Sequence, residues 1–224
     1  MDALLTNFFN LEVFRQVLPF LLQGLLTTIG LSALVIPLGL VGGLGVALLA
    51  TQTSRRWVRF LVAVYVDTFR ALPPIVLLIF IYFGFPFLGI DLPKLLAVAL
   101  GFLLNNAAYY GEIFRAGFLS VPSGQMEAAR STGLTRAQAL IHVVIPQAVH
   151  NVLPDLLGNS IEVVKLTTIA SVVALPELLR IARDAQALVY NPSPIVLAAL
   201  LYLALLWPLV RWLSRLEHKN LMAR

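Results

Sequence analysis

Residues 120–148, SVPSGQMEAARSTGLTRAQALIHVVIPQA, form a moderately polar segment between long apolar ones. A helical run begins at Glu127, and Gly133 breaks it. Thr135 can N-cap a second helix that runs to Val144. The segment is too long and too regularly patterned for a simple connection. It predicts two short helices that meet at a glycine and project from an apolar body.

The chain around this segment is too apolar for a water-soluble domain. Of its 224 residues, 59% are hydrophobic and 12% are charged, and the mean hydropathy is +0.89. A soluble domain carries about 25% charged residues. Most of the stretches without Asp, Glu, Lys or Arg are long enough to cross a bilayer, which takes about 20 apolar residues. These stretches are 16–54, 71–90, 95–111 and 185–210.

The hydropathy pattern predicts an all-α integral membrane protein with five transmembrane helices. We place the spans at about residues 20–50, 58–83, 93–113, 147–172 and 192–214. An odd number of spans puts the termini on opposite sides of the membrane. One side then carries Arg55, Arg56, Arg59, Arg115, Arg130, Arg136, Arg211, Arg215, Lys219 and Arg224, and the other only Arg15, Lys94, Arg180 and Arg183. The positive-inside rule therefore predicts an outside N-terminus and a cytoplasmic C-terminus.

Two segments beside the predicted spans are amphipathic, and the first span is rich in small residues. Residues 8–17 mix apolar side chains with Glu12 and Arg15, which indicates an outer-face amphipathic segment (residues 1–19) before a transmembrane domain of residues 20–217. Residues 177–187 have a similar composition. The first span is rich in glycine, which favours close packing of helices. Those glycines are Gly30, Gly39, Gly42, Gly43 and Gly45.

The polar segment carries a recognisable motif. Its residues are Glu127-Ala128-Ala129, then Gly133 four residues after Ala129, then Val143, Ile145 and Pro146 where the motif has I-x-L-P. The arrangement resembles the EAA loop of ABC importer permeases.

That resemblance implies a coupling function for residues 120–145. In the family this loop is the cytoplasmic helix that docks into a groove on the ATPase subunit, here through Glu127, Ala128, Ala129 and Gly133. The chain has no G-x-x-x-x-G-K-[ST] phosphate loop, so the resemblance implies that ATP and Mg²⁺ belong to a separate ATPase chain, and we expect no cofactor in this one. The alternative is a helical hairpin on the membrane surface with Glu127 only solvated.

Flanking motifs are similar to the polar amino acid importers, which serve histidine, arginine, lysine, glutamine and glutamate. They are GLLTT at 24–28, YVDTFR at 65–70, EIFR at 112–115, GQ at 124–125 and KLTT at 165–168. Residues 176–184, PELLRIARD, particularly resemble the histidine and basic amino acid permeases.

The family resemblance also implies an assembly. It implies the five-helix core of type I importer permeases in the bacterial inner membrane, as a dimer or beside a homologous permease, on two ATPase subunits. A soluble solute-binding protein delivers the substrate from outside. The permease itself carries out no covalent chemistry.

The fourth predicted span contains ionisable residues that form a polar stripe. At 100° per residue, Asp155, Asn159 and Glu162 fall on one side of a helix, with Lys165 next to them. Groups of this kind inside a membrane are usually paired or line a path. The stripe is either a structural ion-pair network or a path for a basic amino acid, because Lys165 can neutralise only one acid. The subfamily's usual asparagine aligns near Gly158, which makes Asn159 the weakest member.

Two i, i+3 pairs, Asp67 with Arg70 and Glu112 with Arg115, are expected to be structural ion pairs. Arg70 is also a candidate for substrate binding, because the broken helix expected near Pro73 can expose backbone groups to a substrate carboxylate.

Alternatives remain in the substrate and in the class of protein. Glutamine, glutamate or an opine are the other substrates, and a membrane-embedded enzyme or a passive channel are the other classes. The chain has no cysteine, and His142, His150 and His218 have no partners at ligand spacing, so we expect no metal site.

Overall fold

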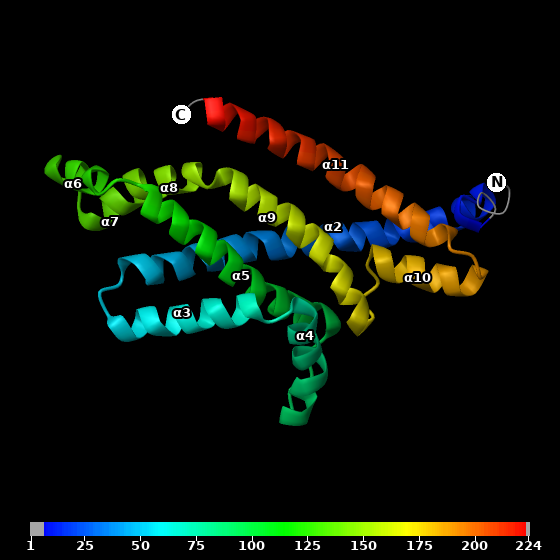
Figure 1. Cartoon of the computed structure of the whole chain (residues 1–224). Coiled ribbons are helices and arrows are strands. Elements are labelled where there is room, and N and C mark those ends of the chain that lie inside the picture. The colour runs from blue at the N-terminus through cyan, green and yellow to red at the C-terminus, as the bar shows by residue number, and fades with distance from the viewer. Residues whose placement is uncertain (1–6, 223–224) are drawn as a thin grey trace. The chain divides into compact units, whose positions relative to one another are not determined.

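The computed structural model describes the backbone of residues 7–222 and the side chains of residues 7–215. Residues 1–6 of the predicted outer-face segment, Arg224, and the side chains of His218 and Lys219 lie outside it. The regular elements of the described chain are all helices (Figure 1), which confirms the predicted all-α class. In order they are α2 (Leu11–Gln52), α3 (Arg56–Ala71), α4 (Pro74–Ile79), η1 (Phe80–Gly84), η2 (Phe85–Leu88), α5 (Lys94–Ser120), α6 (Ser123–Ser131), α7 (Arg136–Ala139), η3 (Leu140–Val144), α8 (Ile145–Asn151), α9 (Leu153–Leu166), η4 (Thr167–Val173), α10 (Leu178–Val189) and α11 (Ser193–Met222).

The helices form two compact units. The terminal unit comprises the chain up to Val35, Pro74–Gly101 and everything from Ile161 onward. The central unit comprises Ile36–Pro73 and Phe102–Ser160. Helices α2, α5 and α9 each contribute one part to each unit.

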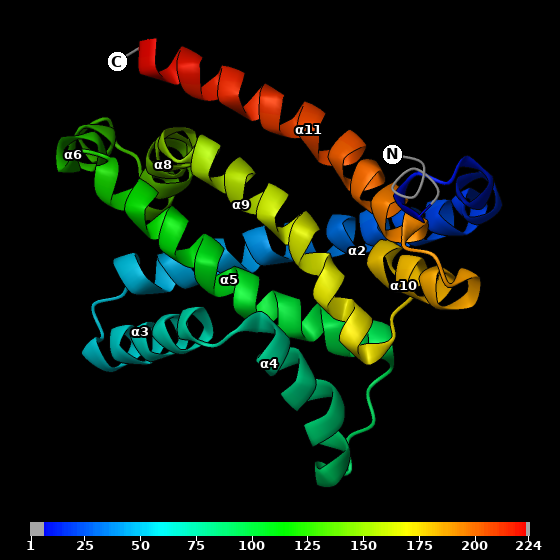
Figure 2. The ribbon, with the colours of Figure 1, turned by 45° about the vertical axis from the view of Figure 1, so that its right-hand side comes forward.

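In the central unit, α3 lies alongside α5 (Figure 2). Tyr65 of α3 donates a hydrogen bond to the carbonyl oxygen of Leu104 at 2.7 Å. Asn105 of α5 donates from its side chain to the carbonyl oxygen of Phe69 at 2.8 Å. Both bonds satisfy polar groups that are partly removed from solvent, so they fix the position of α3 on α5.

The approach of α2 to α5 in the same unit depends on glycine. A Cβ atom at Gly43 would lie 2.4 Å from the Cβ of Tyr110 and 2.8 Å from the amide nitrogen of Gly111. A Cβ at Gly42 would lie 3.1 Å from a side-chain atom of α5, whereas one at Gly45 would have no atom within 4 Å. The predicted packing role of these glycines is confirmed at Gly39, Gly42 and Gly43 and does not hold at Gly30 and Gly45.

Gly43→Ala is therefore expected to destabilise the chain by about 1–3 kcal/mol, because the added methyl group meets backbone atoms that cannot rotate away. Gly45→Ala is the matched control. It adds the same group two residues further along α2, in open space, and raises helix propensity. Thermal unfolding of the purified chain in detergent measures the difference. Equal melting temperatures for the two variants would show that α2 and α5 do not pack in this way.

The terminal unit is built on the first part of α2, α10 and α11. Its buried apolar core consists of Val17, Leu21, Leu178, Ala182 and Ala198. Figure 1 shows α10 beside the first turns of α11, joined by a short turn. The amphipathic helix predicted at 177–187 is thus present as α10, and its apolar side packs into this core.

A buried carboxylate starts α10. Glu177 is fully buried and accepts hydrogen bonds from the backbone nitrogens of Leu179 at 2.8 Å and Arg180 at 2.7 Å. The hydroxyl of Tyr202 on α11 lies 3.1 Å from the same carboxylate. Burial raises the pKa of the Glu177 carboxyl above its ordinary value, while these hydrogen bonds act in the opposite direction. Glu177 therefore ties the start of α10 to α11.

Three helical stretches of the described chain are long and apolar enough to cross a membrane: Leu11–Gln52, Leu153–Val173 and Ser193–Arg215. A fourth candidate is added if α3 and the stretch Pro74–Leu88 that follows it count as one broken span. The stretch predicted at 93–113 is helical, as part of α5, but is not among these candidates. The structure thus supports an apolar helical membrane protein, and the count of five spans remains a prediction.

The structure moves several predicted boundaries. Helix α2 runs unbroken from Leu11, so residues 11–19 belong to the first long helix and not to a separate segment. Leu72 is extended and interrupts the predicted span 58–83, because a proline disfavours helical conformation in the residue before it. The predicted span 147–172 is likewise interrupted at Val152, between α8 and α9.

Candidate functional site

The polar segment after α5 begins with a short helix, α6, as predicted, but the second helix is longer than predicted, because α7 continues through η3 and α8 without a break to Asn151. Helix α6 begins at Ser123, earlier than the Glu127 start expected from sequence. Gly133 has a φ of +92°, a conformation that other residues adopt at a cost, and it ends the first helix. Thr135 then caps α7 through a capping box with Gln138, in which each side chain bonds the other residue's backbone nitrogen. The predicted break and the predicted cap are both confirmed.

The motif residues differ in exposure. Glu127, Ala128 and Gly133 are exposed, whereas Ala129 is buried. Glu127 forms no ion pair with any described residue. An exposed carboxylate flanked by small residues leaves room for another surface to approach closely. The structure therefore leaves Glu127, Ala128 and Gly133 accessible, and docking on an ATPase stays a prediction.

A second feature lies beside this segment in the central unit. This feature is a cavity of about 340 Å³. Its lining residues come from the end of α2 (Gln52), from the polar segment and from η3 (Val144), and Arg130 and Arg136 contribute positive charge to it. Arg136 donates a hydrogen bond of 3.5 Å to the side-chain oxygen of Gln52, which connects α7 to the end of α2. The helical segment is thus held to the central unit by a polar contact.

Helix α9 contains all residues of the predicted polar stripe, of which two belong to each unit. In the central unit Asp155 is exposed and makes no hydrogen bond or ion pair with a described residue, and Asn159 is partly buried. In the terminal unit Lys165 donates to Glu162 in an exposed i, i+3 ion pair. The pairing expected for one of the two acids is confirmed, and the acid that Lys165 neutralises is Glu162. Asp155 is the acid left unpaired.

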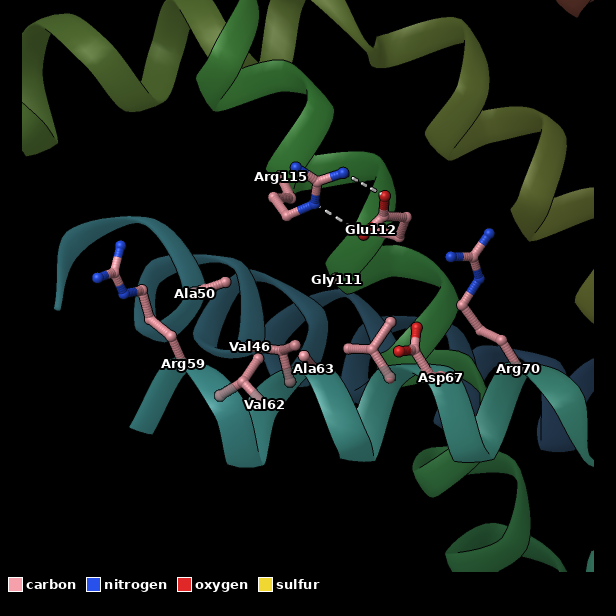
Figure 3. Close-up of a pocket in the computed structure, with 11 residues that line it drawn as sticks. Val46, Ala50, Arg59, Val62, Ala63, Asp67, Arg70, Gly111, Glu112 and Arg115 are labelled. Carbon is pink, nitrogen blue, oxygen red and sulfur yellow. Dashed lines mark hydrogen bonds and ion pairs between the residues drawn. The ribbon is translucent and has the colours of Figure 1, made fainter. Parts of the chain in front are cut away.

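A cavity of about 330 Å³ lies within the central unit among α2, α3 and α5, and we call it the α3–α5 cavity (Figure 3). Its charged side chains come from α3 and α5, and its other lining residues are mostly apolar. The lining consists of Val46, Ala50, Arg59, Val62, Ala63, Val66, Asp67, Arg70, Gly111, Glu112 and Arg115. Arg70, a predicted substrate-binding residue, thus lies at a cavity.

The two predicted i, i+3 pairs behave differently at this cavity. Arg115 donates to both carboxylate oxygens of Glu112, at 2.5 and 2.8 Å, so this predicted pair is confirmed. Asp67 and Arg70 form no ion pair with each other, and the prediction of that pair is wrong. The guanidinium of Arg70 instead lies over the ring of Tyr109, 5.7 Å from its centre. A cation over an aromatic face gains enough to compete with an exposed ion pair.

Sequence reasoning missed Gly111 and Arg59 as parts of this cavity, and Tyr109 as the aromatic partner of Arg70. Tyr109 and Gly111 precede Glu112 on α5, but their spacing along this helix does not indicate that Tyr109 meets Arg70 of α3. Arg59 carries no signal either, because a basic residue near the start of a span fits membrane orientation equally well.

The described chain combines apolar helices long enough to cross a bilayer with a polar helical segment that leaves small residues and a carboxylate exposed, which are features of a polytopic membrane protein. The family described as binding-protein-dependent transport system inner membrane component matches residues 39–220. The chain belongs to this family.

Relatives and solved structures agree with this assignment. In Bacillus subtilis (strain 168), the probable amino-acid ABC transporter permease protein YckA is 32% identical over 88% of this chain and 87% of its own length. The arginine transport system permease protein ArtQ of the same strain is 32% identical over 84% and 86%, and its probable glutamine ABC transporter permease protein GlnP is 38% identical over 70% and 74%.

Among solved structures, one described as an amino acid ABC transporter with histidines matches with a TM-score of 0.82 and 33% identity, over 92% of this chain and 96% of that one. The chain is a permease subunit of the amino-acid ABC transporter type, a translocating component whose ATPase is a separate subunit.

Proposed function

We propose that the chain carries amino acids with a basic side chain, such as arginine, lysine, ornithine or histidine, inward across the bacterial inner membrane. The observation that carries the proposal is the unpaired carboxylate of Asp155 on α9. A carboxylate in an apolar span needs a counter-charge or water, and an ammonium, guanidinium or imidazolium group supplies that charge. A relative named for arginine transport supports the proposal, and one named for glutamine keeps glutamine, with glutamate or an opine, as the alternative.

The proposed complex has four kinds of component. Glu127, Ala128 and Gly133 contact an ATPase subunit that holds ATP and Mg²⁺, and the buried Ala129 supports them from inside the segment. A second copy of this chain or a homologous permease completes the membrane part, and an extracytoplasmic binding protein delivers the substrate, as the family description suggests. The N-terminus lies outside and the C-terminus in the cytoplasm. ATP binding draws the two coupling segments together and opens the path outward, and hydrolysis resets it.

Competition for uptake tests the substrate class. The complex is reconstituted with its ATPase and binding protein, and uptake of radiolabelled arginine is measured with an excess of unlabelled lysine, histidine, glutamine or glutamate. The proposal expects lysine or histidine to reduce uptake about tenfold, and glutamine and glutamate to leave it nearly unchanged, since only a cation meets Asp155. The proposed substrate class would be contradicted if only glutamine competed with arginine. It would also be contradicted if the complex took up glutamine strongly and arginine not at all.

A further inference from the structure

The cavity of about 340 Å³ beside the polar segment carries charge of one sign, and we call it the basic cavity. Arg130 and Arg136 are its charged lining residues, and no Asp or Glu is among the described residues that line it. Neither arginine forms an ion pair with a described residue. A hollow lined by charges of one sign concentrates ions of the opposite sign, so the basic cavity favours an anion.

The helices that carry the two arginines position them at the cavity. Ser123, Met126 and Arg130 follow one another at i, i+3 and i+7, so they lie on one side of α6, and all three line the cavity. Arg136 begins α7, whose start is fixed by a capping box. It donates to the side-chain oxygen of Gln52 at 3.5 Å, and a guanidinium has five N–H donors, so others remain for a ligand.

The rest of the lining is largely apolar. Four of the lining residues have apolar side chains: Val121, Pro122, Met126 and Val144. A free phosphate ion gains nothing from such a wall, whereas the glycerol and first methylene groups of a phospholipid gain by leaving water there. The lining therefore suits an amphiphile with an anionic head better than a small hydrophilic anion.

The basic cavity lies where two long helices end. Gln52 is the last residue of α2, which is a candidate membrane span, and Val121 directly follows the last residue of α5. The positive-inside rule predicts that these ends lie at the cytoplasmic surface. Anionic lipid headgroups of the cytoplasmic leaflet lie at the same level, and basic pockets between helices on that side suit them.

We propose that the basic cavity binds a phosphate group, supplied by the headgroup of an anionic phospholipid of the cytoplasmic leaflet. Arg130 and Arg136 donate to the phosphate oxygens, and the apolar wall contacts the glycerol part of the lipid. The inference rests on the proposed function for its side of the membrane. The bound lipid connects the end of α2 to the segment that is proposed to meet the ATPase.

Binding of short-chain lipids tests the site. The complex of permease and ATPase is purified in a neutral detergent, and native mass spectrometry measures binding of dioctanoyl phosphatidylglycerol, dioctanoyl phosphatidylcholine and inorganic phosphate. Phosphatidylglycerol is expected to bind at least about tenfold more tightly than phosphatidylcholine, whose choline group carries a positive charge that the arginines repel. Inorganic phosphate is expected not to displace phosphatidylglycerol at equal concentration, because it has no part that contacts the apolar wall.

Arg130→Gln and Arg136→Gln are each expected to weaken binding of phosphatidylglycerol about tenfold and to leave binding of phosphatidylcholine unchanged, because each removes a charged hydrogen-bond donor. Arg211→Gln is the matched control. It removes the same charge from an exposed position on α11, outside the cavity lining, and is expected to leave all affinities unchanged. Equal melting temperatures without lipid would show that the three variants are folded.

Three results would overturn the inference. If Arg211→Gln weakens binding of phosphatidylglycerol as much as the cavity variants do, the lipid responds to total charge and not to this site. If inorganic phosphate displaces the lipid at equal concentration, the cavity takes a soluble phosphate and the lipid assignment is wrong. If the cavity variants lose the ATPase while the separated permease binds the lipid as wild type does, the arginines belong to the docking surface.

The lipid measurement is independent of the proposed substrate. No transported amino acid takes part in it, so its failure leaves the proposal of a basic amino acid unchanged. Failure of the uptake competition likewise leaves lipid binding at Arg130 and Arg136 unchanged.

Discussion

Glu127→Lys is expected to abolish ATP-driven uptake while the chain remains inserted in the membrane. Glu127 is exposed on α6 and has no internal ion-pair partner, so the substitution leaves the packing of the chain unchanged. It reverses the charge on the surface proposed to meet the ATPase, and juxtaposed charges of the wrong sign cost several kcal/mol at an interface. The measurements are the amount of ATPase that copurifies with the chain and uptake into proteoliposomes.

Gln125→Lys is the matched control for this prediction. It introduces the same lysine two residues earlier on α6, on a different side of the helix. The side chain of Gln125 is exposed there and accepts a hydrogen bond of 3.2 Å from the side chain of Gln147. It is expected to retain most of the copurified ATPase and most of the uptake. Normal coupling in Glu127→Lys, or equal loss in both variants, would remove the docking assignment.

Gly133→Asp is expected to abolish coupling for a different reason. A side chain at a φ of +92° is strained by roughly 1–2 kcal/mol, and it adds bulk where the two helices meet. Gly133→Asn adds nearly the same shape without the charge. Loss of uptake in both variants would assign the defect to shape, and normal uptake in both would show that this turn does not meet the ATPase.

Asp155→Asn is expected to reduce transport of a basic amino acid about tenfold or more, with substrate-stimulated ATPase activity falling alongside. The change keeps the size and hydrogen-bonding capacity of the side chain and removes its charge. Glu162→Gln is the matched comparison. Glu162 is already neutralised by Lys165, so its loss is expected to affect transport less. Both activities are measured in proteoliposomes that contain the complete complex.

The thermal stability of Asp155→Asn and Glu162→Gln distinguishes a role in substrate binding from a role in holding the structure together. If both transport normally but unfold at lower temperature, the acids of α9 form a structural network and the path lies elsewhere. If Glu162→Gln loses more transport than Asp155→Asn, the ion pair with Lys165 is part of the path, and the assignment of Asp155 is wrong.

Much of the fold could be predicted from the sequence because it depends on local rules. Uncharged apolar runs predicted the long helices, Gly133 predicted a break, and Thr135 predicted a cap that the structure shows as a capping box. These features depend on neighbours within a few residues along the chain. The same holds for Glu112 and Arg115, whose spacing brings the two charges together on one face of α5.

The features that could not be predicted depend on contacts between distant segments. The spacing of Asp67 and Arg70 is the same as that of Glu112 and Arg115, yet Arg70 turns to Tyr109, 39 residues away on α5. To predict that Glu177 is buried, one would need to know that Tyr202 lies against the start of α10. Periodicity along one helix carries no information about such partners.

This chain is the translocating subunit of an amino-acid ABC transporter, and we propose that it works as an ATP-driven importer. The most direct measurement is uptake of radiolabelled arginine into proteoliposomes that contain the permease and its ATPase, with the binding protein outside and ATP or no nucleotide inside. We expect arginine to accumulate above its outside concentration only when both ATP and the binding protein are present. Arginine that equilibrates across the membrane without ATP and without the binding protein would contradict it and indicate a passive channel.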